Sequence, residues 1–284
     1  MSSLKQRLLV GSVVSAIVLF VIALANNAYF KPITMGITTL IIAYSIWEFH
    51  QISHNKAQKP AVFLSLIAAI AYAISVALST QYVACKELPS LVILASLISF
   101  FGYYFLKGDS PFLNLAITLF SFVYLAIPLS CMIAITYFFT LSGEQDGRCW
   151  IVYLIAVTKM TDTAAFFVGK RFGKTKFAPF ISPKKTWEGA LGGLASACVI
   201  STLLTFVFKL LNAPFSLTLF QSIWMGALLG VLAEFGDLAE SLLKRDGGLK
   251  DSNHLPGLGG ILDMVDSLVF TAPFVYIFLN ASFR

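Results

Sequence analysis

The sequence predicts an all-α fold: a multi-pass transmembrane helical bundle of about nine helices with a cytoplasmic N-terminus. Three observations predict it. Of 284 residues, 58% are hydrophobic and only 12% are charged, whereas soluble domains carry about 25% charged residues. The apolar residues form long continuous runs, and lipid admits only helices or closed barrels, of which continuous runs favour helices. Lysine and arginine are distributed unequally between alternate loops.

A spanning helix needs about 20 mostly apolar residues. Such runs lie near residues 8–25, 33–49, 61–84, 89–106, 115–141, 150–169, 189–211, 218–236 and 261–282. The first follows Lys5 and Arg7 as a signal peptide would, but it lacks a convincing cleavage site, so we expect a retained helix. The fifth contains Pro128, which predicts a kink or a tilt.

The loop charges set the predicted orientation. With the N-terminus inside, fourteen Lys and Arg residues fall in cytoplasmic segments and four in outside segments. This asymmetry follows the positive-inside rule and supports nine helices. The net charge of +6 does not indicate nucleic acid as a partner, because the charges are not pooled in a basic domain. We therefore expect an integral membrane protein with its polar site facing the cytoplasm. The membrane we expect is a bacterial-type inner (cell) membrane.

Polarity changes near residue 150 within what we expect to be one integral membrane domain. We expect residues 1–150 to form N-terminal transmembrane helices with few functional groups, and residues 151–284 to form a C-terminal transmembrane half that carries the chemistry. Glu48 is an exception in the first part, either an interfacial residue or a polar contact to the second part. The four cysteines contain no CxxC pair and are expected to be small buried side chains.

Nine of the fourteen acidic residues lie between 162 and 266. One helical face carries, at spacings of three and four, Asp237, Glu240, Ser241 and Lys244. Asp263 and Asp266 share a face near the start of the last helix. Carboxylates from two helix ends could hold magnesium, which prefers such oxygens and bridges to phosphates. Alternatively, they form a structural ion-pair network with Lys244, Arg245 and Lys250.

Two further segments could bind anions. Residues 246–260 form a polar, glycine-rich loop that precedes a helix start, where backbone N–H groups favour negative charge. Residues 170–189 carry six cations, which either bind phosphate or only set topology and attract anionic lipid. Asp162 follows Lys159 by one turn inside the sixth run, where a buried ion pair is the simplest interpretation.

These segments resemble the phosphatidate cytidylyltransferase (CDP-diacylglycerol synthase) family. The likeness rests on three ordered blocks, DTAAFFVGKRFGK at 162–174, SPKKTWEG at 182–189 and SLLKRDGGLKDSNHLPGLGGILDMVDS at 241–267, with Gly236-Asp237 before the last. It covers about 110 residues, and the first 150 match only as a generic helical lead-in.

The resemblance implies transfer of a cytidylyl group from CTP to phosphatidic acid, giving CDP-diacylglycerol and pyrophosphate. It implies a magnesium ion, with room for a monovalent partner such as K⁺, held by Asp237 and Asp263 with Asp266 as a third ligand. Dimers are expected from the resemblance alone, and membrane lipids surround the helices. The expected catalytic residues are Asp237, Lys244, Asp263 and Asp266. The expected substrate-binding residues are Asp162, Ser182, Lys184, Lys185, Thr186, Ser241, Arg245, Lys250 and Asp251.

Two positions depart from the family pattern. Leu258 stands where the family usually has His, and Met264 where it usually has Arg. A phosphate contact from either position is therefore absent, and it is either dispensable or replaced by His254, Lys250 or Arg245.

Two other functions fit parts of the sequence. Gly259, Asp263 and Asp266 also resemble a CDP-alcohol phosphotransferase site, but their spacing and the missing upstream Asp-Gly pair count against it. A transporter could use Lys159 and Asp162 along its path, although the sequence shows no inverted repeat.

Overall fold

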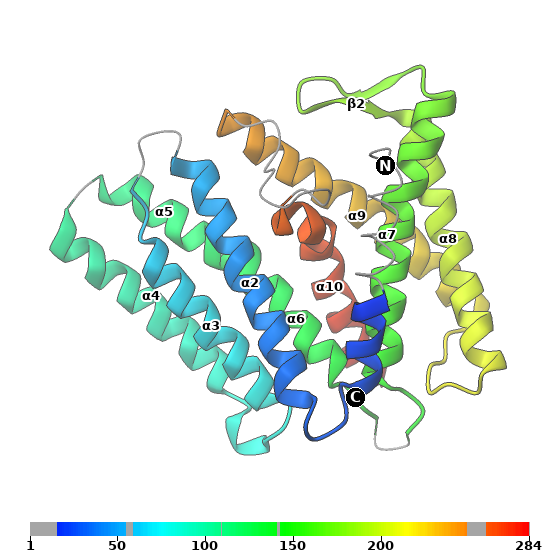
Figure 1. Cartoon of the computed structure of the whole chain (residues 1–284), viewed down its shortest axis with the longest axis horizontal. Coiled ribbons are helices and arrows are strands. Elements are labelled where there is room, and N and C mark those ends of the chain that lie inside the picture. Colours follow the sequence, from blue (N-terminus) through cyan, green and yellow to red (C-terminus); the bar gives the residue numbers. More distant parts are fainter. Residues whose placement is uncertain (1–15, 55–58, 109, 141–142, 249–259, 284) are drawn as a thin grey trace. The chain divides into compact units, whose positions relative to one another are not determined.

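The computed structural model describes residues 16–54, 59–108, 110–140, 143–248 and 260–283, and these are predominantly helical (Figure 1). Within them, eight helices are long and apolar enough to cross a membrane. A further helix covers residues 16–24, within the first predicted run, whose earlier part lies outside the described residues. The all-α, multi-pass prediction is confirmed. The helices are α2 (Lys31–His54), α3 (Val62–Ser79), α4 (Leu88–Lys107), α5 (Pro111–Ser121), α6 (Ile127–Thr136), α7 (Gly147–Phe172), α8 (Trp187–Leu210), α9 (Leu219–Asp246) and α10 (Ile261–Phe283).

The chain forms two compact units. The first comprises Met1–Ala134 and Asp246–Val265, and the second comprises Ile135–Arg245 and Asp266–Arg284. Each unit consists of two separate stretches of chain, because helices far apart in sequence pack together. The change of polarity near residue 150 stays a prediction about where the functional groups lie.

In the first unit, α2, α3, α4 and α5 lie side by side (Figure 1). A short 3₁₀ turn, η1 (Val83–Cys85), precedes α4. The fifth predicted span is α5, a five-residue π-helical segment η2 (Phe122–Ala126), and α6. The irregularity lies directly before Pro128, which lacks the N–H that a regular helix would use. Glu48 is buried, and its Oε2 accepts a hydrogen bond from Leu262 N at 2.6 Å at the start of α10.

In the second unit, α7 and α8 are joined by a small antiparallel hairpin that sequence analysis did not predict. Its strands are β1 (Lys176–Ala178) and β2 (Ser182–Thr186), with Lys176 opposite Thr186 and Ala178 opposite Ser182. Thr186 ends β2 and caps α8, because its Oγ1 accepts a hydrogen bond from Gly189 N at 3.2 Å. The end of the hairpin is therefore anchored to the start of α8.

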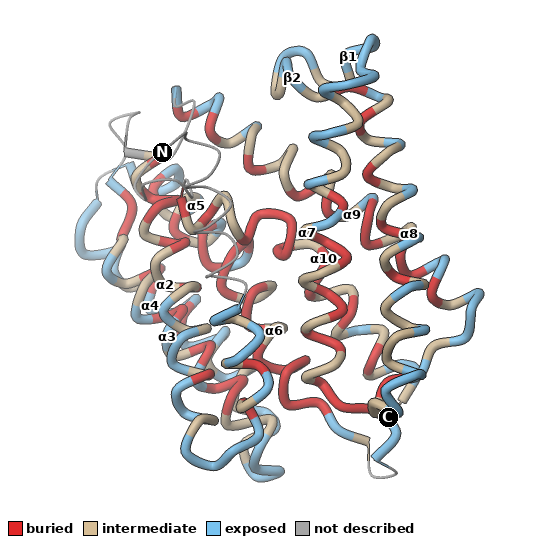
Figure 2. The backbone as a smooth tube through the Cα atoms, turned by 45° about the vertical axis from the view of Figure 1, so that its right-hand side comes forward, coloured by how far each residue is buried: buried red, intermediate tan, exposed pale blue. Residues whose placement is uncertain are grey.

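Helix α9 continues ten residues past its predicted end at residue 236, and its extension carries the polar face. Figure 2 shows α10 buried or half-buried along most of its length. The two helices approach closely at Gly236, where an added Cβ would lie 2.6 Å from Asp266 O and 2.8 Å from Ser267 Cα. Glycine at this position lets the acidic parts of α9 and α10 meet.

We predict that Gly236→Ala destabilises the fold. The new methyl would meet backbone atoms that cannot rotate away, and overpacking of this kind costs about 1–3 kcal/mol. Thermal unfolding of the detergent-purified protein should show a Tm several degrees lower.

Gly102→Ala in α4 is the matched control, because a Cβ there meets nothing within 4 Å. Its effect should stay within about 1 kcal/mol, the difference in helix propensity between the two residues. Equal Tm values for the two variants would contradict the close approach at Gly236.

Candidate active site

Three carboxylates from two helices of the second unit lie close together. Asp237 and Glu240 come from α9 and Asp266 from α10, and one oxygen of each lies within 4.8 Å of the others. Glu240 and Asp266 are only 3% and 4% exposed. Buried carboxylates at this separation repel one another unless cations offset their charge. The chemistry of the group, three hard oxygen donors, suits a divalent cation.

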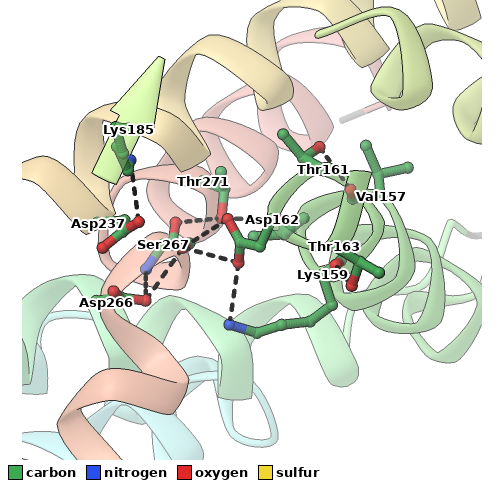
Figure 3. A network of polar contacts seen from close by, with 11 residues as sticks. Val157, Lys159, Thr161, Asp162, Thr163, Lys185, Asp237, Asp266, Ser267 and Thr271 are labelled. Carbon is green, nitrogen blue, oxygen red and sulfur yellow. Dashed lines mark hydrogen bonds and ion pairs between the residues drawn. The ribbon is translucent and has the colours of Figure 1, made fainter. Parts of the chain in front are cut away.

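Lys185 reaches this group from β2. Its Nζ lies 2.9 Å from Asp237 Oδ2 and 2.8 Å from Glu234 Oε2, and Figure 3 shows its side chain directed at Asp237. Burial by itself lowers the pKa of Lys185, but the carboxylates of Asp237 and Glu234 outweigh it and raise that pKa above its ordinary value. Lys185 therefore stays charged at neutral pH. Its pairs stabilise the fold below the ordinary lysine pKa, and this contribution is lost as the pH rises through the folded pKa.

Lys244 supplies a second cation to the same group. It is buried, and its Nζ lies 2.7 Å from Glu240 Oε1, one helical turn earlier on α9. Ser241 Oγ lies 3.5 Å from Asp237 Oδ1. Asp237, Glu240, Ser241 and Lys244 all lie in α9, so the helical spacing expected from the sequence applies to them.

A chain of polar contacts links Asp266 to α7 (Figure 3). Ser267 Oγ lies 3.1 Å from Asp266 Oδ1 and 3.2 Å from Asp162 Oδ2. Lys159 Nζ lies 3.5 Å from the same Asp162 oxygen. The expected Lys159–Asp162 pair is thus present, but it is not buried, because the two side chains are 38% and 31% exposed. The pair is linked through the Ser267 hydroxyl to the carboxylate group.

Asp263 lies one turn before Asp266 on α10, where its Oδ2 accepts a hydrogen bond from Gly260 N at 3.1 Å. The group of three carboxylates found among the described residues therefore shares two members, Asp237 and Asp266, with the predicted metal set, and has Glu240 as its third.

The remaining predicted residues divide between the hairpin, the end of α9 and the glycine-rich loop. Thr186 is buried as the α8 cap, Lys184 is exposed, and Ser182 is half-buried. Arg245 Nε donates to Ile181 O at 3.1 Å, which ties the end of α9 to the hairpin. Lys250 and Asp251, together with Leu258 and His254, lie outside the described residues.

The sequence matches the cytidylyltransferase family over residues 5–282. The chain belongs to this family. A phosphatidate cytidylyltransferase of Chlamydia muridarum is 32% identical over 295 residues, which cover 98% of this chain and 93% of the relative. One of Chlamydia pneumoniae is 41% identical over 172 residues, covering 57% and 53%, and one of Bacillus subtilis is 44% identical over 137 residues, covering 48% and 49%. The last two matches span about half the length of those relatives.

Sequence reasoning on this cytidylyltransferase did not assign a role to Glu234 or Ser267. Glu234 precedes Asp237 by three residues on α9, so the helical spacing that selected Asp237 could also have selected it. Ser267 follows Asp266 directly and ends the third block of the resemblance, but its spacing from the other polar residues gave it no separate role. Its position is visible only once α7 and α10 are packed together.

We predict that Ser267→Ala lowers cytidylyltransferase turnover by about tenfold, the loss expected when a buried carboxylate loses a hydrogen bond worth ~1–2 kcal/mol. The measurement is the initial rate of CTP consumption by the purified protein. Ser45→Ala is the matched control, because Ser45 is also a buried hydroxyl and its Oγ donates at 2.8 Å to Ile41 O of its own helix. Equal turnover in both variants would show that Ser267 does not orient Asp266.

Proposed function

We propose that this cytidylyltransferase transfers the cytidylyl group of CTP to phosphatidic acid, giving CDP-diacylglycerol and pyrophosphate. The observation that carries the proposal is the carboxylate group of Asp237, Glu240 and Asp266 with Lys185 and Lys244 beside it, in a chain of membrane-spanning helices. The relative named phosphatidate cytidylyltransferase that aligns over nearly the whole chain supports the same substrate pair.

The reaction needs no strong base and no covalent nucleophile from the protein. A phosphate oxygen of phosphatidic acid attacks the α-phosphorus of CTP, a P–O bond forms there, and the bond to the β-phosphate breaks as pyrophosphate leaves. The attacking oxygen is already anionic. The difficulty is to bring two polyanions together, so catalysis consists of positioning and of stabilising negative charge.

A magnesium ion fits the donor set of the site. Asp237, Glu240 and Asp266 would hold it, and Asp263, selected by motif, is an additional proposed ligand. When bound, such an ion supplies positive charge that neutralises nucleotide phosphates and orients them. A monovalent cation such as K⁺ is a further proposal for the same acidic region.

The chain's own cations have distinct roles in this proposal. Lys184 lies on the hairpin, and Arg245 donates a hydrogen bond to it. Both side chains are exposed, so they can bind phosphate groups of CTP or lipid. Ser182 and Lys250 extend that surface, and Asp162 and Asp251 complete the proposed substrate contacts. Lys244 is paired with buried Glu240 and offsets charge within the carboxylate group, which is a role in preorganisation.

We place the protein in a bacterial-type inner membrane with the site facing the cytoplasm. The support for this orientation is the distribution of Lys and Arg outside the predicted apolar runs, with fourteen on the proposed inner side and four on the outer. A site at the membrane surface lets the acyl chains of the substrate and product stay in the bilayer. A homodimer is part of the proposal and rests on the family resemblance alone.

We predict that the detergent-purified protein converts labelled CTP and phosphatidic acid to CDP-diacylglycerol when Mg²⁺ is present, and that EDTA abolishes the reaction until Mg²⁺ is restored. The measurement is thin-layer separation of the labelled lipid product. Use of CDP-diacylglycerol plus an alcohol, with CTP ignored, would instead indicate a CDP-alcohol phosphotransferase. Substrate flux into sealed liposomes without nucleotide turnover would indicate a transporter.

Asp237→Asn should lower turnover by roughly two to three orders of magnitude, the usual cost of removing one group that stabilises charge in a transition state. Circular dichroism should show an intact helical fold. Asp263→Asn tests the ligand selected by motif in the same assay, and normal turnover in either variant would remove that residue from the proposed site.

Glu87→Gln is the control for loss of a carboxylate, because Glu87 is exposed at the start of α4 in the first unit. Its turnover should equal that of the unmodified protein.

A further inference from the structure

Among the residues that the structure describes, the ammonium group of Lys185 has three close oxygen neighbours, all on α9. Its Nζ lies 2.8 Å from Glu234 Oε2, 3.3 Å from Glu234 O and 2.9 Å from Asp237 Oδ2. A lysine ammonium has three N–H donors. In this arrangement the ammonium group has three acceptor oxygens of α9 around it, so Lys185 is held by the protein's own carboxylates.

Of the three side chains in this ion-pair network, two are well shielded from water. The side chains of Lys185 and Glu234 are 18% and 12% exposed, whereas Asp237 is 37% exposed. Removing one partner of a shielded ion pair leaves the other charge uncompensated, which changes how strongly that charge acts on its remaining neighbours. The charge of Glu234 therefore affects how strongly Lys185 attracts Asp237.

The polypeptide around this pair holds both residues in place. Thr186, next to Lys185, is fixed between glycines of α7 and α8, since a Cβ on Gly169 or Gly189 would lie 3.0 or 3.1 Å from its Oγ1. On the other side, Gly193 of α8 leaves room for Glu234, because a Cβ on Gly193 would lie 3.1 Å from Glu234 Oε1. The ion pair is thus fixed from α7, α8 and α9.

We infer that Glu234 is a positioning residue: by sharing the charge of Lys185, it fixes the orientation of Asp237 and leaves that carboxylate available to a cation. Without the Glu234 charge, Lys185 would be neutralised by Asp237 alone and would compete with a cation for it. Glu234 itself touches neither cation nor substrate in this inference. The inference rests on the proposed cation site but not on the identity of the substrates.

The test is a double-mutant cycle of Glu234→Gln and Lys185→Gln, with Mg²⁺ binding measured by titration calorimetry on the full chain in detergent, without CTP or lipid. We expect Glu234→Gln to weaken Mg²⁺ binding roughly three- to tenfold, the coupling typical of residues in one ion-pair network. On the Lys185→Gln background, the same change should have an effect of less than about twofold. Glu87→Gln is the control and should leave Mg²⁺ binding unchanged.

A second measurement separates positioning from folding. At saturating Mg²⁺ the turnover of Glu234→Gln should be close to normal, while the Mg²⁺ concentration for half-maximal rate should rise by the same factor as the binding constant. A general loss of structure would instead lower turnover at every Mg²⁺ concentration and would contradict the inference.

Three results would overturn it: unchanged Mg²⁺ binding in Glu234→Gln, an equally large effect with and without Lys185, or no Mg²⁺ binding by the unmodified protein. The second would mean that Glu234 acts on the cation directly. Normal Mg²⁺ behaviour in the cycle, together with no conversion of CTP and phosphatidic acid, would refute only the proposed function.

Discussion

The second unit depends on keeping several carboxylates close together where little water can screen them. Asp237, Glu240 and Asp266 each offer an oxygen within 4.8 Å of the others, and two of these residues are almost completely buried. Such an arrangement is unfavourable unless positive charge is fixed beside it. Lys185 from the hairpin and Lys244 from α9 supply that charge. Their ion pairs with the acidic group therefore help to hold the hairpin and the extension of α9 in place.

Small residues make this arrangement sterically possible. Gly236 lets α9 approach the backbone of α10, and glycines on α7 and α8 surround Thr186 and give space to Glu234. These contacts explain why a short strand pair in an otherwise helical protein is well placed to carry a lysine into the site. The packing of backbone against backbone determines the position of the Cα atom of each charged residue. The ion pairs then determine the position of its charged group.

The acidic group also accounts for the kind of chemistry proposed. A reaction between two phosphates requires compensation of negative charge more than proton transfer, and a site composed of carboxylates and lysines can hold a divalent cation and orient anions. Membership of the cytidylyltransferase family and the apolar helices place this chemistry in a membrane protein, where one substrate can be a lipid. In our proposal, Ser267 and Glu234 set the orientation of Asp266 and Asp237.

The sequence by itself determined the helical membrane fold, because runs of apolar residues long enough to cross a bilayer have few alternatives. It also determined that Asp237, Glu240, Ser241 and Lys244 share a face, since helical spacing fixes which residues are neighbours. It identified the family from three blocks of residues. It did not predict the hairpin, because residues 176–186 carry mostly turn and charged residues without a strand pattern.

Only the tertiary structure decided which charges meet. Lys185 and Glu234 are 49 residues apart, and Asp162 and Ser267 are 105 apart, so no local pattern could pair them. Glu240 and Asp237 of α9 lie close to Asp266 of α10 because Gly236 lets the two helices approach closely beside these residues. Spacing along a helix follows from geometry that every residue shares, whereas contact between helices depends on the shapes of particular side chains, and these act only when the chain is folded.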